Sequence, residues 1–201
     1  MLRLLLARHG ETTGNAEGRC QGQDDVPMTP RGHEQAARLA ARLASESFTA
    51  IYASDLSRAW DTARAIAAHH PAVPLHAEPR LREQSKGIWD GMLWEDIYRD
   101  YAAAWAAYQA DRDHVPPGGE RLSDVVARLA TLARDIAQAH PDGQVLLVAH
   151  GAVLRTLICL QLGIDPALTW NFHLDNTGLA ELRAYPDGWV LHRLNDTCHL
   201  G

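Results

Sequence analysis

Two short apolar runs in this chain each end on a histidine. The run at residues 4–7 leads into Arg8 and His9, the run at residues 145–149 leads into His150, and a glycine follows each histidine. The carboxyl ends of neighbouring parallel strands share one crevice, in which the ligands of open α/β sheets bind. An imidazole there can attack phosphorus, and a guanidinium can bind two phosphate oxygens. These residues therefore predict a site for a phosphate ester, with a histidine as the nucleophile.

Arg58, Glu83 and the chain after His150 supply further groups that such a reaction uses. Arg58 lies early in a predicted helix, just after the second predicted strand, so its forked guanidinium could bind phosphate oxygens. Glu83 could protonate the leaving alcohol and, as a carboxylate, activate water. The His150 imidazole could donate to a phosphoryl oxygen, and the backbone N–H groups of the helix that follows can face an anion. Any one of these residues alone is more often solvated or locally bonded, but together they favour a functional site.

Strands and helices alternate along the chain, as they must to bring these residues together. Thr29 and Pro30 open a helix, since threonine suits the N-cap and proline the first turn. The expected strands cover residues 2–7, 50–53 and 145–149, with an antiparallel hairpin at 177–184 and 189–194. The expected helices cover 30–43, 54–66, 93–110, 122–136 and 152–162, and residues 9–28 form a long loop. This order predicts an α/β fold, a three-layer α/β/α sandwich with a mostly parallel, mixed central sheet flanked by helices.

Composition limits the class of protein. The chain has 201 residues, 46% of them hydrophobic and 22% charged, which predicts one globular domain over residues 1–201. The formal net charge is −6 and no basic cluster stands out, so no nucleic-acid partner is expected. Positive potential for a phosphate ester must then be local, near the arginines already named.

The cysteines and apolar runs predict a cytoplasmic protein. Three widely spaced cysteines do not suit a disulfide framework, and no apolar run approaches membrane-spanning length. Neither an HExxH nor a CxxC pattern occurs, so no built-in zinc site is predicted, and no cofactor is expected. His69 and His70 adjoin at a helix end and are expected to be solvated. Cys20 is expected near the pocket without a catalytic role.

Taken in order, these segments resemble the histidine phosphatase superfamily, also called the phosphoglycerate mutase-like family. The matching segments are 8–12 with Asn15, 18–22, 28–32, 54–59 with 62–63, 81–91, 117–120 and 148–151. The resemblance implies a central mixed sheet flanked by helices, a site that needs no metal, and a phosphohistidine intermediate.

The resemblance also implies a role for each matching residue. His9 would be the nucleophile, and Glu83 would be the proton donor. The phosphate pocket would be formed by Arg8, Arg58 and His150, assisted by Asn15 and the Gly151 backbone, and Gln21 and Gly22 would border the substrate.

The superfamily contains phosphatases and mutases, and the sequence favours a phosphatase. Mutases that act on phosphoglycerate resemble longer chains with extra basic residues after the acid segment, whereas residues 92–97 here are apolar and acidic. The expected function is a metal-independent phosphomonoesterase acting on a small phosphorylated metabolite. A phosphoglycerate mutase, a non-catalytic phosphate-binding protein and a metal-dependent hydrolase are the alternatives. The substrate is left open between sugar phosphates, phosphoglycerate derivatives and ribazole phosphate, and so is the oligomeric state, a homodimer included.

Overall fold

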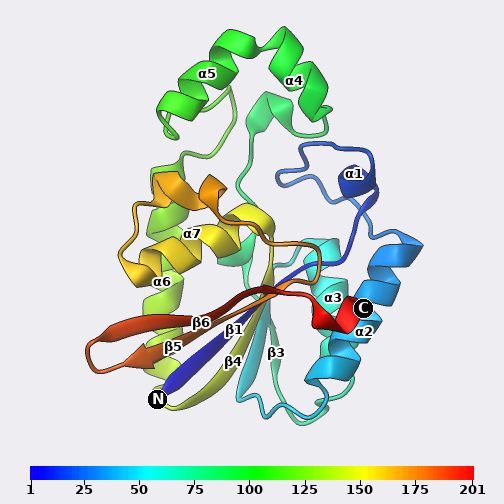
Figure 1. The fold of residues 1–201 in the computed structure, drawn as a ribbon, viewed down its shortest axis with the longest axis vertical. Helices are drawn as coiled ribbons and strands as arrows, with labels where there is room; N and C mark the ends of the chain where they lie inside the picture. Colours follow the sequence, from blue (N-terminus) through cyan, green and yellow to red (C-terminus); the bar gives the residue numbers. More distant parts are fainter.

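The computed structural model describes residues 1–201, and its centre is a six-stranded sheet in the order β3-β2-β4-β1-β5-β6 (Figure 1). Strands β1 to β4 run parallel, and β5 and β6 complete the sheet in antiparallel pairing. The strands are β1 (Leu2–Arg8), β2 (Ala50–Ala53), β3 (Leu75–Ala77), β4 (Gly143–Ala149), β5 (Leu179–Tyr185) and β6 (Gly188–Asp196). The predicted mixed, mostly parallel sheet is confirmed.

Helices cover both faces of this sheet. The helices of the chain are α1 (Thr13–Ala16), α2 (Pro30–Leu43), α3 (Ser57–Ala67), α4 (Trp94–Asp100), α5 (Ala102–Ala110), α6 (Leu122–Ala139) and α7 (Gly151–Leu162). Short 3-10 turns occur at Pro79–Leu81, Gly87–Trp89, Pro166–Asn171 and Cys198–Leu200. Helices α2 and α3 pack on one face and α6 and α7 on the other, which confirms the three-layer sandwich (Figure 1). No helix is both long and apolar enough to span a bilayer.

The register of β1 against β4 brings the two histidines together. Arg8 pairs with Ala149, and the His9 N–H donates to the Ala149 carbonyl at 3.0 Å. His150 follows Ala149 directly, so both imidazoles lie at the carboxyl ends of adjacent parallel strands. Their ring centroids are 5.1 Å apart.

Glycines fix the path of the chain just after β1. A Cβ on Gly10 would lie 2.4 Å from the Gly32 carbonyl oxygen, and a Cβ on Gly32 would lie 2.0 Å from that of Glu11. The segment after β1 therefore crosses the first turn of α2 in direct backbone contact, closer than any side chain would permit. This contact holds His9 in place from behind.

A cap of α4 and α5 lies above the carboxyl ends of the strands (Figure 1). The sequence predicted one helix over 93–110, but the chain breaks at Tyr101 into two. The break lets both helices pack around Trp89, which is fully buried with Ile97 and Tyr108 in a small core separate from the sheet. Aromatic packing thus overrides the local preference for a continuous helix.

Two other local predictions were wrong. The predicted loop 9–28 contains α1, which Thr12 and Asn15 begin with a capping box. His70 is buried rather than solvated, because its Nε2 contacts the Leu43 carbonyl at 3.1 Å and its ring packs against Phe48.

Candidate active site

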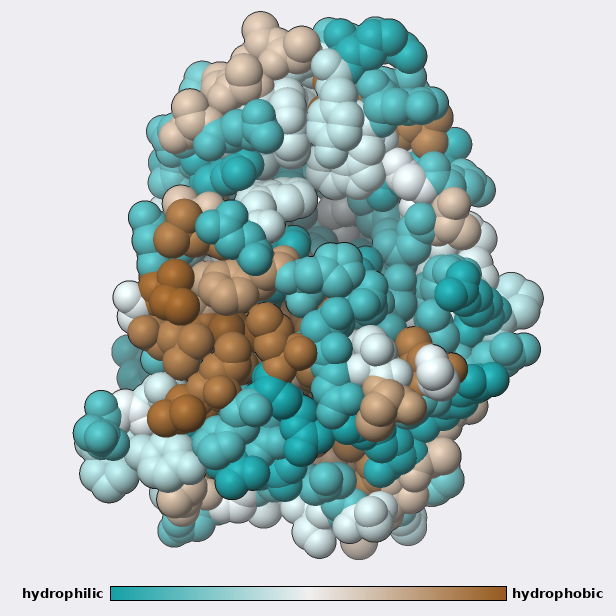
Figure 2. Space-filling model, in the orientation of Figure 1, coloured by the Kyte–Doolittle hydropathy of each residue, from teal (hydrophilic) through white to brown (hydrophobic).

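A cleft of about 290 Å³ opens between the cap and the carboxyl ends of β1 and β4. Figure 2 shows this side of the molecule hollowed below the cap. Its lining includes all but one of the sequence-predicted site residues: Arg8, His9, Asn15, Gln21, Gly22, Arg58, Glu83 and Gly151. His150 is fully buried behind them, against His9. The structure thus brings together residues from five separate segments of the chain.

His9 has one nitrogen committed and one available. Its Nδ1 lies 2.7 Å from the Gly10 carbonyl oxygen, which can only accept, so Nδ1 carries the proton and Nε2 keeps a lone pair. Burial holds the pKa of His9 well below its usual value, and Arg58 and Arg8 lower it further. The ring is therefore neutral near pH 7, as a nucleophile toward phosphorus must be.

His150 is neutral too, but it carries its proton on the other nitrogen. Its Nδ1 accepts from Arg58 Nε at 3.2 Å, and because a guanidinium can only donate, the proton sits on Nε2. Nε2 lies 2.9 Å from Ser54 Oγ and donates to it. Burial, followed by the charge of Arg58, holds the pKa of His150 well below its usual value.

Arg58 is held by the loop that follows α1 and has no carboxylate partner. Its Nη1 donates to the Asp24 carbonyl at 2.6 Å and its Nη2 to the Gly22 carbonyl at 2.8 Å. The side chain is only 1% exposed. Burial lowers its pKa, and two of its five N–H donors remain unused. A buried guanidinium without a carboxylate indicates that an anion binds beside it.

Arg8 is also incompletely satisfied. Its Nη1 donates to the Leu174 carbonyl at 2.7 Å, whereas its Nε is buried and has no partner in the protein. A Cβ on Gly151 would lie 3.6 Å from this Nε, so the glycine leaves the space beside it open. Unpaired buried donors are rare in native proteins, and a phosphate oxygen would satisfy this one.

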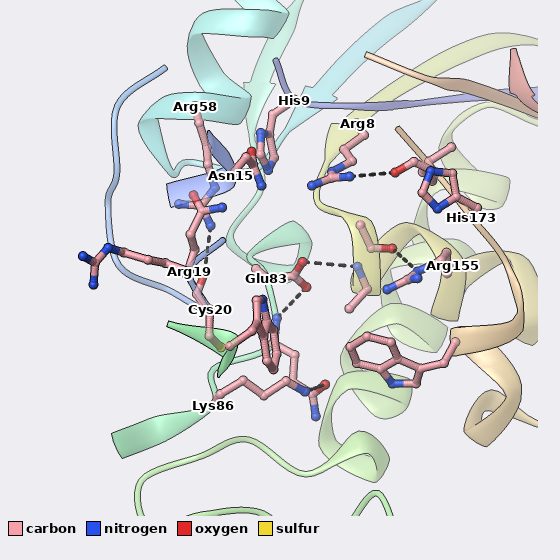
Figure 3. Close-up of a pocket in the computed structure, with 18 of the residues that line it drawn as sticks. Arg8, His9, Asn15, Arg19, Cys20, Arg58, Glu83, Lys86, Arg155 and His173 are labelled. Carbon is pink, nitrogen blue, oxygen red and sulfur yellow. Dashed lines mark hydrogen bonds between the residues drawn. The ribbon is translucent and has the colours of Figure 1, made fainter. Parts of the chain in front are cut away.

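Glu83 lies between His9 and Lys86 in the view of Figure 3. One carboxylate oxygen accepts from the Gln84 N–H at 2.9 Å and the other from the Ala152 N–H at 3.2 Å, in the first turn of α7. The positive end of that helix favours negative charge there. Glu83 is thus fixed beside the phosphate end of the cleft, where it could exchange a proton with an ester oxygen.

Asn15 and Gln21 are held in a small polar network, one member of which, Asn176, was not predicted from the sequence. Asn15 Oδ1 accepts from the Thr12 N–H and from Asn176 Nδ2, both at 3.1 Å, which leaves its own amide N–H groups free. Asn176 also donates to the His9 carbonyl at 3.1 Å. Gln21 Oε1 accepts from the Thr12 hydroxyl at 2.7 Å. Asn176 was missed because it lies in an irregular turn before β5, with no periodic pattern around it.

The rest of the cleft lining consists of residues that were not predicted as site residues. They are Arg19, Gln84, Lys86, Trp94, Tyr98, Ala152, Arg155, Trp170, His173 and Leu174. Cys20 also lines the cleft, near the pocket as predicted. No group of three or more His, Cys, Asp or Glu side chains is arranged to hold a metal ion.

Similarity to known proteins extends over nearly the whole chain. A family model described as the histidine phosphatase superfamily (branch 1) matches residues 4–197. The chain is 33% identical over 202 residues to phosphoserine phosphatase 1 of Hydrogenobacter thermophilus, covering 100% of this chain and 95% of that protein. It is 32% identical to phosphoglycerate mutase-like protein 4 of Arabidopsis thaliana, covering 98% and 86%. The structure of YhfR from Bacillus stearothermophilus superposes with a TM-score of 0.91 at 30% identity, covering 100% of both chains.

Proposed function

Because the chain belongs to the histidine phosphatase superfamily, we propose that it is a phosphomonoesterase that hydrolyses a small phosphorylated metabolite through a phosphohistidine, without a metal ion. One observation carries the proposal. His9 presents an unprotonated Nε2 to the cleft. Arg8 and Arg58 line the same cleft, and neither forms an ion pair with a carboxylate. A dianionic phosphate ester supplies what both arginines lack and places phosphorus beside the nucleophile.

The first step forms the phosphoenzyme. The lone pair of His9 Nε2 attacks phosphorus, a P–N bond forms, and the bond from phosphorus to the ester oxygen breaks. Glu83 in its acid form gives its proton to the departing oxygen, so the alcohol leaves neutral. Arg8 and Arg58 bind the phosphoryl oxygens and stabilise the charge on them through the transition state.

The second step returns the enzyme to its starting state. Glu83 is now a carboxylate and takes a proton from water as the water oxygen attacks phosphorus. The P–N bond breaks, the electron pair returns to Nε2, and inorganic phosphate leaves. The Gly10 carbonyl continues to hold the proton on Nδ1, so the nucleophile is regenerated in the correct tautomer.

His150 requires a change of tautomer to take part. In the free protein its Nδ1 accepts from Arg58, so it cannot donate there to a phosphoryl oxygen. Donation becomes possible when Arg58 Nε releases Nδ1, the proton moves to Nδ1 and the Ser54 hydroxyl turns to donate to Nε2. We propose that phosphate binding favours this second arrangement, because it converts a ring acceptor into a donor toward an anion.

A phosphoglycerate mutase is the second candidate, favoured by the name of the Arabidopsis relative. Hydrolysis is preferred because the cleft is open below the cap, so water can reach the phosphohistidine (Figure 2). Supplying 3-phosphoglycerate with a bisphosphorylated primer distinguishes the two. Release of inorganic phosphate supports the phosphatase, and isomer without phosphate release supports the mutase.

The central test uses His9→Ala. This variant should not turn over an aryl phosphate, whereas the unaltered enzyme should yield an acid-labile, alkali-stable phosphoenzyme on rapid quenching. Activity retained by His9→Ala would exclude the proposed route.

A further inference from the structure

Lys86 is the one lysine in the chain, and it lines the cleft although it is only 5% exposed. Burying an ammonium group is costly unless charge and hydrogen bonds compensate it. Apart from the histidines, the other basic side chains of this protein are arginines, and several of those on the surface form ion pairs. A buried lysine in the substrate cleft therefore calls for a partner.

The protein itself gives Lys86 only neutral partners. Its Nζ donates to Gln84 Oε1 and to the Tyr108 hydroxyl, and it lies 4.5 Å from the centre of the Tyr108 ring. It forms no ion pair with a carboxylate. An ammonium has three donors, so at least one remains for a ligand.

Arg155 is a second uncompensated cation on the same cleft. Its Nε donates to the Gly151 carbonyl and its Nη1 to the Phe172 carbonyl, each at 3.0 Å, and the guanidinium lies 5.1 Å from the Trp170 ring centre. These contacts fix the plane of the group and leave Nη2 unused. By contrast, Arg19 in the same lining is paired with Glu17 at 2.6 Å.

Lys86 lies apart from the phosphate end, and Arg155 lies at the side of it. In Figure 3, His9, Arg8 and Arg58 lie on one side of Glu83 and Lys86 lies on the opposite side, while Arg155 lies level with Glu83, below Arg8. Aromatic rings border this part of the cleft, with Trp94 and Trp170 centred 6.4 Å apart. Aromatic walls lower the local dielectric constant and strengthen any ion pair formed between them.

We propose that Lys86 and Arg155 bind a second anionic group, carried by the alcohol part of the substrate. The inference rests on the proposed function, because an ester whose phosphorus faces His9 and whose oxygen faces Glu83 must extend its leaving group toward this region. The substrates are then short phosphate esters with a carboxylate or a second phosphate. A cleft of about 290 Å³ is at the lower end of the usual range for ligand pockets, which suits so small a molecule.

Matched pairs of esters test the proposal. One pair is phosphoserine and phosphoethanolamine, which differ by a carboxylate, and the other is propanediol bisphosphate and propyl phosphate, which differ by a phosphate. Binding is measured by calorimetry to His9→Ala, so that turnover is not needed. In at least one pair, we expect the more anionic ester to bind tighter by about 30-fold, as for a desolvated charge pair. The pair that shows the preference identifies the anion.

Lys86→Met in the same background should abolish most of that preference. Removing a buried cation that has only neutral partners should not prevent folding. Arg99→Gln, which removes one exposed positive charge from the cap, is the control for net charge and should keep the preference. Arg155→Gln should reduce the preference as Lys86→Met does.

Two results would overturn the proposal. One is equal affinity for both members of both pairs, and the other is a preference that survives Lys86→Met and Arg155→Gln alike. Measuring kcat/KM for the same esters in the unaltered enzyme and in Lys86→Met gives an independent reading of the preference. Phosphate release without any anion preference would reject the subsite and leave the phosphatase proposal intact. A binding preference without any turnover would support the anion subsite and reject the phosphatase proposal.

Discussion

Arg58 donates from Nε to Nδ1 of His150 at 3.2 Å, although the two residues are 92 positions apart in the chain. This single contact decides which His150 nitrogen carries the proton, because the guanidinium cannot accept a hydrogen bond. It also ties the helix after β2 to the end of β4. The proposed phosphate pocket is therefore partly assembled before any ligand arrives, and ligand binding has to replace this contact as well as change the tautomer of His150.

Ser54→Ala tests this tautomer change. Ser54 is fully buried and contacts His150 Nε2 at 2.9 Å, so alanine removes the hydroxyl that must donate when His150 turns its proton toward phosphate. We expect kcat/KM to fall about tenfold, as for one lost hydrogen bond in a buried network. The imidazole nitrogen shifts of His150 should change with phosphate in the unaltered protein and not in the variant. Unchanged kinetics would show that Ser54 only fills space.

Arg58→Lys tests whether activity requires the forked guanidinium of Arg58 or only its positive charge. Arg58 reaches three acceptors through three separate nitrogens, and an ammonium at the end of a lysine cannot reproduce this geometry. We expect kcat/KM to fall by about 100-fold or more. The matched control is Arg64→Lys on the exposed face of the same helix, which should behave like the unaltered enzyme. Equal activity of both variants would contradict the assigned role.

Stability should depend on pH through His9 and His150. Burial is the main cause that lowers both pKa values well below 6.5 in the folded state. Below about pH 6.5 the unfolded chain therefore binds more protons than the folded chain, and the free energy of unfolding falls as the pH drops toward the folded pKa values. Above that pH both states are neutral and these residues add no slope.

Denaturation with urea at about pH 5 and about pH 7 measures this effect, which is at most about 1.4 kcal/mol per pH unit for each histidine. His9→Gln should make the pH dependence shallower. The exposed His33→Gln is the comparison and should keep the original slope. A slope that His9→Gln leaves unaltered would mean that His9 is not held neutral by burial.

Cys20 should be chemically inert despite lining the cleft. Burial, and next the charge of Asp90, raise the pKa of its thiol to about 12, so almost no thiolate exists near pH 8. Iodoacetamide should label the exposed Cys198 and spare Cys20 and the buried Cys159. Peptide mass spectrometry reads the labelled positions, and phosphatase activity should survive the treatment. Rapid labelling of Cys20 with loss of activity would contradict this expectation.

Much of the sheet could be predicted from local pattern because its strands are short, apolar and bounded by turn residues. The run before His9 and the run before His150 are strands in the structure, and their parallel pairing places both histidines at one edge. The boundaries of β2 were predicted as they are found. The cap was predicted less well, because the break at Tyr101 depends on how Trp89 is enclosed by residues from both helices.

The sequence by itself determined the alternation of strands and helices and the two strand ends that carry His9 and His150. Hydrophobic periodicity and backbone sterics act over a few residues and can be read locally. Only the tertiary structure decided that Arg58 contacts His150, that Asn176 supports His9, and that Lys86 and Arg155 share a cleft. Such contacts join distant segments, and they depend on packing angles and side-chain rotamers that no local pattern specifies.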